Sequence, residues 1–181
     1  MRRFIALVAA VVAAVALGGL SPAAAASEPY CGIRWGSVPE VHDEYSNAQL
    51  VNVRAGRHGC YDRLVLDFRG DVDGYRVEYV SSVTTDGAGQ VLPLRGDARL
   101  QVVALAAAYD DVGNPTYRPA NPSELVDVSG WRTFRQIGWA GSFEGQTTIG
   151  LGVRARLPFR VFILDGPGTG SRLVIDVAHR W

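Results

Sequence analysis

Aromatic and charged side chains gather in one stretch of the sequence. Seven of them fall within residues 131–144: Trp131, Arg132, Phe134, Arg135, Trp139, Phe143 and Glu144. Flat aromatic rings with a few polar neighbours are how a β-domain holds the face of a sugar, by stacking and by directed hydrogen bonds. The stretch therefore predicts a ligand-binding surface for a carbohydrate.

The two tryptophans of this stretch also have a second interpretation, as filling for a hydrophobic core. Trp131 and Trp139 are eight residues apart and would share one face of a regular strand. Trp139 lies between Gly138 and Ala140, where a core position is favoured over ligand contact. Trp131 follows Gly130 and is closer to a turn. Core and ligand contact therefore remain alternatives for both side chains.

A long segment without hydrophobic periodicity precedes this stretch. Tyr109–Glu124 contains three prolines and two tyrosines, Tyr109 and Tyr117. Because loops on a rigid scaffold frequently carry function, we expect Tyr109 and Tyr117 to border the aromatic surface.

No arrangement of residues typical of an enzyme is found in the sequence. The Gly-x-Ser-x-Gly turn of serine hydrolases is absent. Glycoside hydrolysis needs two nearby carboxyl groups, but Asp110 and Asp111 are more typical of a solvated turn, which leaves Glu144 alone. The three histidines are far apart in the sequence: His42, His58 and His179. We expect a protein that is not an enzyme and uses no metal ion or other cofactor; a hydrolase that uses Asp or Glu is the alternative.

Residues 1–26 have the features of a secretory signal peptide. Arg2 and Arg3 precede the uncharged apolar run Phe4–Leu17, and small residues follow up to Ala26. This 14-residue run is shorter than the roughly 20 residues that span a bilayer. We expect cleavage after Ala26 and a secreted protein with no stable membrane insertion; a membrane anchor is the alternative.

Cys31 and Cys60 are the only cysteines of the chain, and both follow the predicted cleavage site. In an oxidising compartment two such cysteines are expected to form a disulfide. Zinc binding together with His42 or His58 is the alternative, but the spacings fit no zinc pattern. We expect the bond to tether residues 27–46, which have little periodicity, to the domain that follows.

From Asn47 onward, apolar and polar residues alternate over short segments that glycine, aspartate and proline separate. Five segments show the alternation clearly: Tyr61–Arg69, Arg99–Ala104, Thr147–Arg154, Phe159–Ile163 and Arg172–Val177. Further strands are expected in five other segments: Ala48–Arg54, Gly74–Val80, Gln90–Leu94, Leu125–Val128 and Phe134–Gly141. About ten strands without alternating helices predict an all-β fold, a β-sandwich or a closed barrel.

One short sequence is repeated, because the pattern of Arg63–Asp67 recurs in Arg172–Asp176. The repeat is compatible with a pseudo-symmetric sandwich of two similar antiparallel sheets that face each other. In each copy the Arg and the Asp lie four residues apart on one strand face. This spacing favours cross-strand ion pairs on a solvated face over a role in ligand binding.

Taken in order, six segments resemble the AMIN-like domain of secreted proteins and lipoproteins of high-GC Gram-positive bacteria: Tyr61–Phe68, Gly74–Tyr79, Gly96–Leu100, Gly141–Gly145, Pro158–Val161 and Arg172–His179. The resemblance covers roughly residues 47–181. AMIN domains proper are β-sandwiches of two related sheets, non-catalytic modules of cell-wall amidases and secretin pores that bind peptidoglycan. The resemblance implies a β-sandwich over residues 47–181 that binds peptidoglycan or another wall glycan; docking to another exported protein is the alternative.

The composition excludes two further classes of protein. The 181 residues include 18 basic and 18 acidic side chains, and every basic one is Arg. With 48% hydrophobic residues and no net charge, the chain is neither disordered nor basic enough to bind nucleic acid through its phosphates. Arg without Lys is typical of a GC-rich genome, and by itself it does not indicate phosphate recognition.

Overall fold

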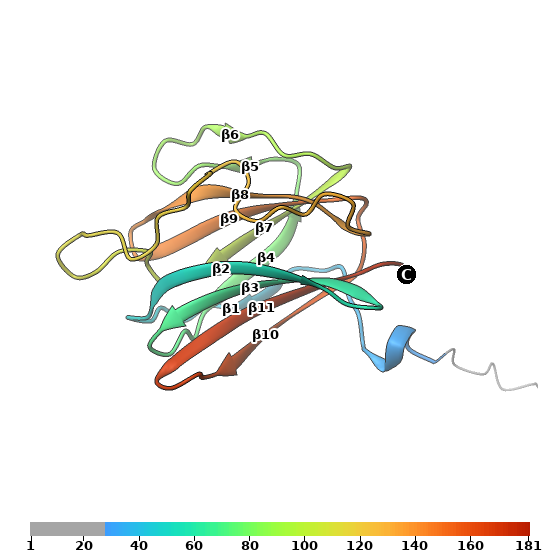
Figure 1. The fold of residues 1–181 in the computed structure, drawn as a ribbon, viewed down its shortest axis with the longest axis horizontal. Coiled ribbons are helices and arrows are strands. Elements are labelled where there is room, and N and C mark those ends of the chain that lie inside the picture. Colours follow the sequence, from blue (N-terminus) through green and yellow to red (C-terminus); the bar gives the residue numbers. More distant parts are fainter. Residues whose placement is uncertain (1–27) are drawn as a thin grey trace, which may run out of the picture.

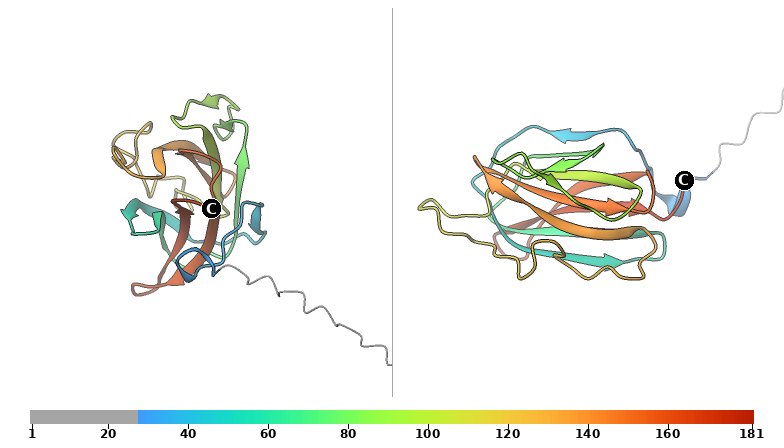
Figure 2. Two further views of the ribbon diagram at one scale, coloured as in Figure 1. Left: turned by 90° about the vertical axis from the view of Figure 1, so that its right-hand side faces the viewer. Right: turned by 90° about the horizontal axis from the view of Figure 1, so that it is seen from above.

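The computed structural model describes residues 28–181, in which two antiparallel sheets pack face to face (Figures 1 and 2). Sheet A contains, in spatial order, β10 (Phe159–Asp165), β11 (Gly170–Ala178), β3 (Tyr61–Arg69) and β2 (Gln49–Arg57). Sheet B contains β1 (Glu40–His42), β4 (Tyr75–Val80), β7 (Ala98–Ala104), β9 (Gln146–Val153) and β8 (Phe134–Phe143). A small hairpin is formed by β5 (Val83–Thr84) and β6 (Val91–Leu92). The predicted all-β sandwich is confirmed.

The core lies between the two sheets and follows the period-two pattern of the sequence. In β3, the side chains of Leu64, Leu66 and Phe68 are buried, and Ile149 and Leu151 of β9 are buried as well. Because successive strand residues point to opposite faces, one alternating set fills the core while its neighbours reach the outer surface. The sandwich thus provides a rigid frame for the residues at its edges.

The repeated sequence lies within one sheet and does not relate the two sheets to each other. β3 and β11 are antiparallel neighbours in sheet A, in which Leu66 is opposite Leu173 and Arg63 is opposite Asp176. Arg63 Nε donates to Asp176 Oδ1 at 2.6 Å, so the predicted cross-strand ion pair is present. The face is less solvated than expected, because the Asp176 side chain has no exposed surface.

A segment after β4 covers part of the outer face of sheet B. Figure 1 shows the β5–β6 hairpin lying over β8, β9 and β7. Two glycines of β9 permit this approach, since a Cβ on Gly150 would lie 2.7 Å from Leu94 Cδ1 and one on Gly152 would lie 2.0 Å from the Arg95 carbonyl oxygen. The alternation of glycine with apolar residues in β9 therefore brings the backbone of Arg95 against the sheet.

The long loop between β7 and β8 runs along the free edge of β8. Trp139 N donates to Pro122 O at 2.7 Å, and Leu125 N donates to Ile137 O at 2.8 Å. Within residues 28–181 these are the only two backbone bonds between this loop and β8, so the expected strand at Leu125–Val128 is wrong. The chain turns away instead, because Asp127 accepts a hydrogen bond from Ser129 N in a tight local turn.

The N-terminal segment is more regular than its sequence suggested. It contains a 3₁₀ turn, η1 (Tyr30–Gly32), and β1, which pairs with β4 at the edge of sheet B. The Cys31–Cys60 disulfide is confirmed and ties η1 to the turn between β2 and β3. Figures 1 and 2 show η1 near the C-terminus, at one end of the sandwich. The predicted signal peptide and its cleavage site lie outside the described residues.

Candidate functional site

The structure distributes the nine residues of the predicted ligand surface along β8 and its flanks. Trp131, Phe134 and Arg135 line one hollow, which we call the Trp131 hollow, and Tyr109, Tyr117 and Trp139 line a second, the Trp139 hollow. The other three residues lie outside both hollows: Arg132, Phe143 and Glu144. The predicted surface is therefore divided between two neighbouring sites.

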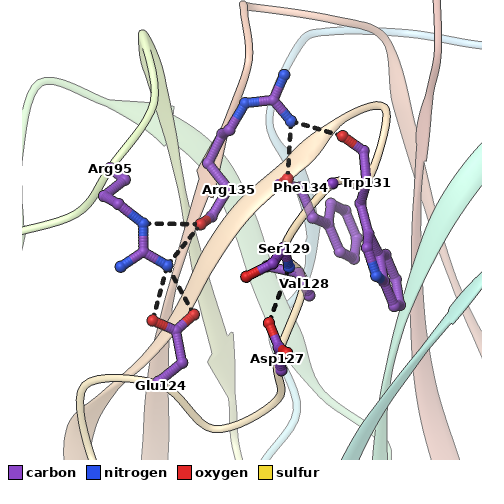
Figure 3. A pocket seen from close by; sticks show the side chains of 9 residues that line it. Arg95, Glu124, Asp127, Val128, Ser129, Trp131, Phe134 and Arg135 are labelled. Atoms are coloured by element: carbon purple, nitrogen blue, oxygen red, sulfur yellow. Dashed lines mark hydrogen bonds and ion pairs between the residues drawn. The ribbon is translucent and has the colours of Figure 1, made fainter.

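The Trp131 hollow lies at the start of β8 and has a volume of about 680 Å³ (Figure 3). Its wall combines aromatic, acidic and basic groups: Arg95, Glu124, Asp127, Val128, Ser129, Gly130, Trp131, Phe134 and Arg135. The Trp131 and Phe134 rings are nearly parallel, with centroids 6.0 Å apart. Phe134 is fully buried and Trp131 is half-buried, so the Phe134 ring supports the Trp131 ring on the side of the core. This arrangement offers a fixed, partly exposed aromatic surface.

Arg95 organises the polar side of the Trp131 hollow. Its guanidinium Nη2 donates to both carboxylate oxygens of Glu124, at 2.7 and 2.8 Å, and to the carbonyl oxygen of Arg135 at 2.9 Å. Its backbone N donates to Gln136 Oε1 at 2.8 Å. These contacts fix the side chain from the loop and from β8 at once, as Figure 3 shows.

Asp127 and Arg135 complete the charged groups of this hollow. Hydrogen bonds from Ser129 hold the pKa of the exposed Asp127 carboxyl below its ordinary value, so it stays ionised at neutral pH. Arg135 Nη1 donates to the carbonyl oxygens of Trp131 and Phe134, both at 2.9 Å, which holds the chain around Trp131 in place. The hollow therefore presents both positive and negative groups beside an indole.

The Trp139 hollow is less charged and has a volume of about 420 Å³. Tyr117 and Trp139 meet at a tilted angle with ring centroids 5.4 Å apart, and both are half-buried. Burial raises the pKa of the Tyr117 hydroxyl, which stays protonated and available as a hydrogen-bond donor at neutral pH. The rest of the wall is formed by the proline-rich loop and β8: Ala108, Tyr109, Gly113, Pro115, Arg118, Pro119, Pro122 and Ser142.

Tyr109 is fixed at the far end of this second hollow. Its hydroxyl oxygen accepts a hydrogen bond from Gly145 N at 2.9 Å, in the turn between β8 and β9. Phe143 and Glu144 belong to the same end of β8, where both are exposed and Glu144 has a positive φ of 50°. The structure therefore places these two residues beside the site and outside its walls.

Segment Pro122–Leu125 separates the two hollows. Pro122 lines the Trp139 hollow, Glu124 lines the Trp131 hollow, and the two backbone bonds to β8 lie at this point. Five residues of extended strand separate Phe134 from Trp139, a distance of about 17 Å at roughly 3.3 Å per residue. An extended ligand that runs along the β8 edge could therefore contact both hollows.

Sequence reasoning missed Arg95, Glu124, Asp127 and Ser129 as residues of the site. Arg95 is far from residues 131–144 in the sequence. It lies beside them only because the segment that contains it crosses the outer face of sheet B. The one available signal was the glycine alternation of β9, in which Gly150 and Gly152 mark a close approach of another backbone.

The fold and these hollows define a class of protein: an antiparallel β-sandwich whose edge strand presents aromatic and polar groups in shallow sites, as binding modules do. The AMIN-like domain model matches residues 48–179, and the chain belongs to that family. No curated protein and no solved structure matches the chain. Domains of this family are binding modules of extracytoplasmic proteins. Within residues 28–181, no helix has the length and apolar character to cross a membrane.

Proposed function

We propose that the chain is a secreted, non-catalytic module that binds a cell-wall glycan, with peptidoglycan as the leading candidate, along the β8 edge. One observation supports this most directly: two half-buried tryptophans, Trp131 and Trp139, lie in separate polar-rimmed hollows on one edge strand. Aromatic rings beside hydrogen-bonding groups suit sugar faces. Two such places in a row suit a polymer better than a single sugar.

The charges of the Trp131 hollow fit the peptide-bearing part of such a polymer. Peptidoglycan carries carboxylates and amines on its stem peptides, and this hollow offers Arg95 and Arg135 beside Glu124 and Asp127. The Trp139 hollow, with its tyrosines and prolines, suits the uncharged sugar backbone.

The acids that line the hollows do not support hydrolysis. A glycosidase needs a general acid whose pKa is raised so that it stays protonated. Among residues 28–181, the carboxyl groups with a raised pKa are Glu40 and Asp86, both through burial, and neither lines the two hollows. Glu124 is committed to Arg95, and the pKa of Asp127 is lowered. These features support binding without turnover.

Sedimentation of the purified protein with insoluble peptidoglycan tests the proposal. We expect saturable co-sedimentation that falls at least about tenfold in Trp131→Ala and Trp139→Ala, because aromatic stacking is lost. Trp181→Ala is the matched control, since Trp181 is 70% exposed and lies outside both hollows. No sugar or peptide should be released from the wall material during incubation.

Failure of the wild-type protein to sediment, or an equal loss in all three variants, would contradict the proposal. Release of reducing sugars would revive the hydrolase alternative. Docking to another exported protein has one supporting observation, the exposed Val38 just before β1 and Val41 within it, at the edge of sheet B opposite to β8. Capture of one defined exported protein by a chain that does not bind walls would favour that function instead.

A further inference from the structure

A third hollow, which we call the His179 hollow, lies where the β2–β3 turn, the loop before β8 and the C-terminus meet. It has a volume of about 320 Å³, and its walls include Arg57, His58, Asp62, Arg132 and His179. Gly130 lines both this hollow and the Trp131 hollow, so the two are neighbours. Arg132, which the sequence placed in the ligand surface, therefore belongs to this separate site.

The two arginines of this hollow carry uncompensated charge. The guanidinium groups of Arg57 and Arg132 are exposed, and neither has a hydrogen bond or ion pair with any residue of 28–181. Arg57 also lies over the Trp131 ring, 5.9 Å from its centroid, which orients it between the two hollows. The exposed His58 ring stacks on Tyr61 at 4.5 Å and forms a further part of the wall.

The single acidic side chain of this wall already has hydrogen-bond partners on both of its oxygens. Asp62 is buried, and its Oδ2 accepts hydrogen bonds from the backbone N of Thr133 and Phe134 at 2.7 and 3.0 Å. Its Oδ1 lies 3.1 Å from His179 Nε2. Asp62 therefore fixes the wall from within and is not available to pair with Arg57 or Arg132.

His179 lines the hollow beside Asp62. Its side chain is only 8% exposed, and its buried Nδ1 has no hydrogen-bond partner among the described residues. Because Nδ1 is enclosed, a ligand in the hollow would contact Arg57 and Arg132 and not this atom.

The frame around this hollow is rigid. His179 N donates to Cys60 O at 2.9 Å, next to the disulfide, and Arg154 Nη2 donates to His179 O at 2.7 Å. The Thr133 hydroxyl donates to Ala178 O at 3.2 Å. Such a frame fixes the backbone of the wall before a ligand arrives, which lowers the ordering cost of binding.

We propose that the His179 hollow is an oxyanion site, which takes a phosphate or carboxylate group between Arg57 and Arg132. Guanidinium groups bind both anions through two parallel hydrogen bonds. The inference rests on the proposed function only for the source of the anion, a charged substituent of the polymer that contacts Trp131. Binding of a small anion to the hollow does not depend on it.

The test is a titration of the isotope-labelled protein with inorganic phosphate and, separately, with acetate, at constant ionic strength in chloride. We expect saturable changes in the NMR signals of the Arg57 and Arg132 Nε–H groups and of the amides around residues 57–62 and 130–133. The variant R57Q/R132Q should weaken binding at least about tenfold, because two charge-assisted contacts are lost. Tighter binding of phosphate would assign a phosphate source, and tighter binding of acetate a carboxylate source.

The matched control is R54Q/R76Q, which removes the same net charge from two arginines that are already paired with Asp67 and Asp43. Its affinity for the anion should stay within about twofold of wild type. An absence of saturable binding to either anion, or an equal loss in the control, would overturn the inference. Phosphate binding without wall binding would refute the proposed function alone, whereas wall binding without any anion binding would refute the oxyanion site alone.

Discussion

Arginine has different roles in two regions of this sandwich. On the outer face of sheet A, Arg63 and Arg160 both bond Asp176, whose side chain is fully buried. In the His179 hollow, Arg57 and Arg132 have no acidic partner among residues 28–181. The comparison separates arginines that hold the fold together from arginines that remain available for a ligand.

The paired region is also shielded by aromatic rings. The Arg160 guanidinium lies 5.0 Å from the Phe162 centroid and 5.5 Å from that of Trp35, which the N-terminal segment brings over the sheet. Arg63 lies 5.2 Å from the Tyr61 ring. These ring contacts on the outer face contribute to stability, whereas Trp139 and Trp131, which has Arg57 over its ring, line open hollows.

The largest loss of stability is expected from Asp176→Ala, in the region where the arginines are paired. Removal of the buried carboxylate leaves two guanidinium groups without their partner, which should lower the free energy of unfolding by about 3–5 kcal/mol. The Arg63 and Arg160 side chains are 22% and 32% exposed, so their rehydration offsets part of the loss. Urea denaturation measures the loss.

Asp67→Ala is the matched control on the same face, because its partner Arg54 is 51% exposed. This variant should lose less than about 1 kcal/mol of the free energy of unfolding. Equal losses in the two variants would show that the buried pair has no special role in the fold.

The next effect concerns the disulfide at the end of the sandwich. Replacement of Cys31 and Cys60 by Ser opens a loop with a sequence separation of 29 and should cost about 3–4 kcal/mol in the chain-entropy model. Hydrogen exchange should rise most in residues 30–45 and beside His179, whose backbone bonds Cys60. Uniform exchange across both sheets would contradict a local role for the bond.

A smaller loss of stability is expected from Gly152→Ala, with a strong effect on binding. The new Cβ would meet the Arg95 carbonyl oxygen at 2.0 Å, so the Arg95 segment must shift. We expect a loss of about 1–3 kcal/mol from overpacking and at least tenfold weaker wall binding, because Arg95 loses Glu124. Gly36→Ala, where the new Cβ meets no atom within 4 Å, should leave binding unchanged.

The smallest effect on the fold is expected from salt. Raising the ionic strength from about 0.1 M to about 1 M shortens the Debye length from about 10 Å to about 3 Å. Binding through exposed arginines should weaken several-fold, while the melting temperature should change little because Asp176 is buried. A melting temperature that falls as steeply as binding would remove the distinction between the two regions.

Much of the fold could be predicted from the sequence, because strands with one buried face alternate visibly. β3 runs over Tyr61–Arg69 as expected, and the other clearly alternating segments each became a strand. The pairing of the repeated segments was harder to foresee. Arg63–Asp67 and Arg172–Asp176 are neighbours in sheet A, and a period of two residues alone does not predict which strands pair.

The candidate site was predictable only in part. The sequence placed Trp131 and Trp139 on a common surface, and the structure places them in two hollows separated by Pro122–Leu125. That separation depends on two backbone bonds between the loop and β8, which leave no pattern in the sequence. Arg57 could not be foreseen either, since it reaches the site from the far end of β2 in the other sheet.

The most direct test of the central claim uses the four tryptophans of the chain as reporters. Trp131 and Trp139 lie in the proposed binding hollows, whereas Trp35 lies over Arg160, which is paired with Asp176, and Trp181 is exposed near the C-terminus. The indole N–H signals should be followed by NMR during titration with soluble peptidoglycan fragments. The account predicts saturable changes for Trp131 and Trp139, with Trp35 and Trp181 unmoved; changes at Trp35 with Trp131 and Trp139 unmoved would contradict it.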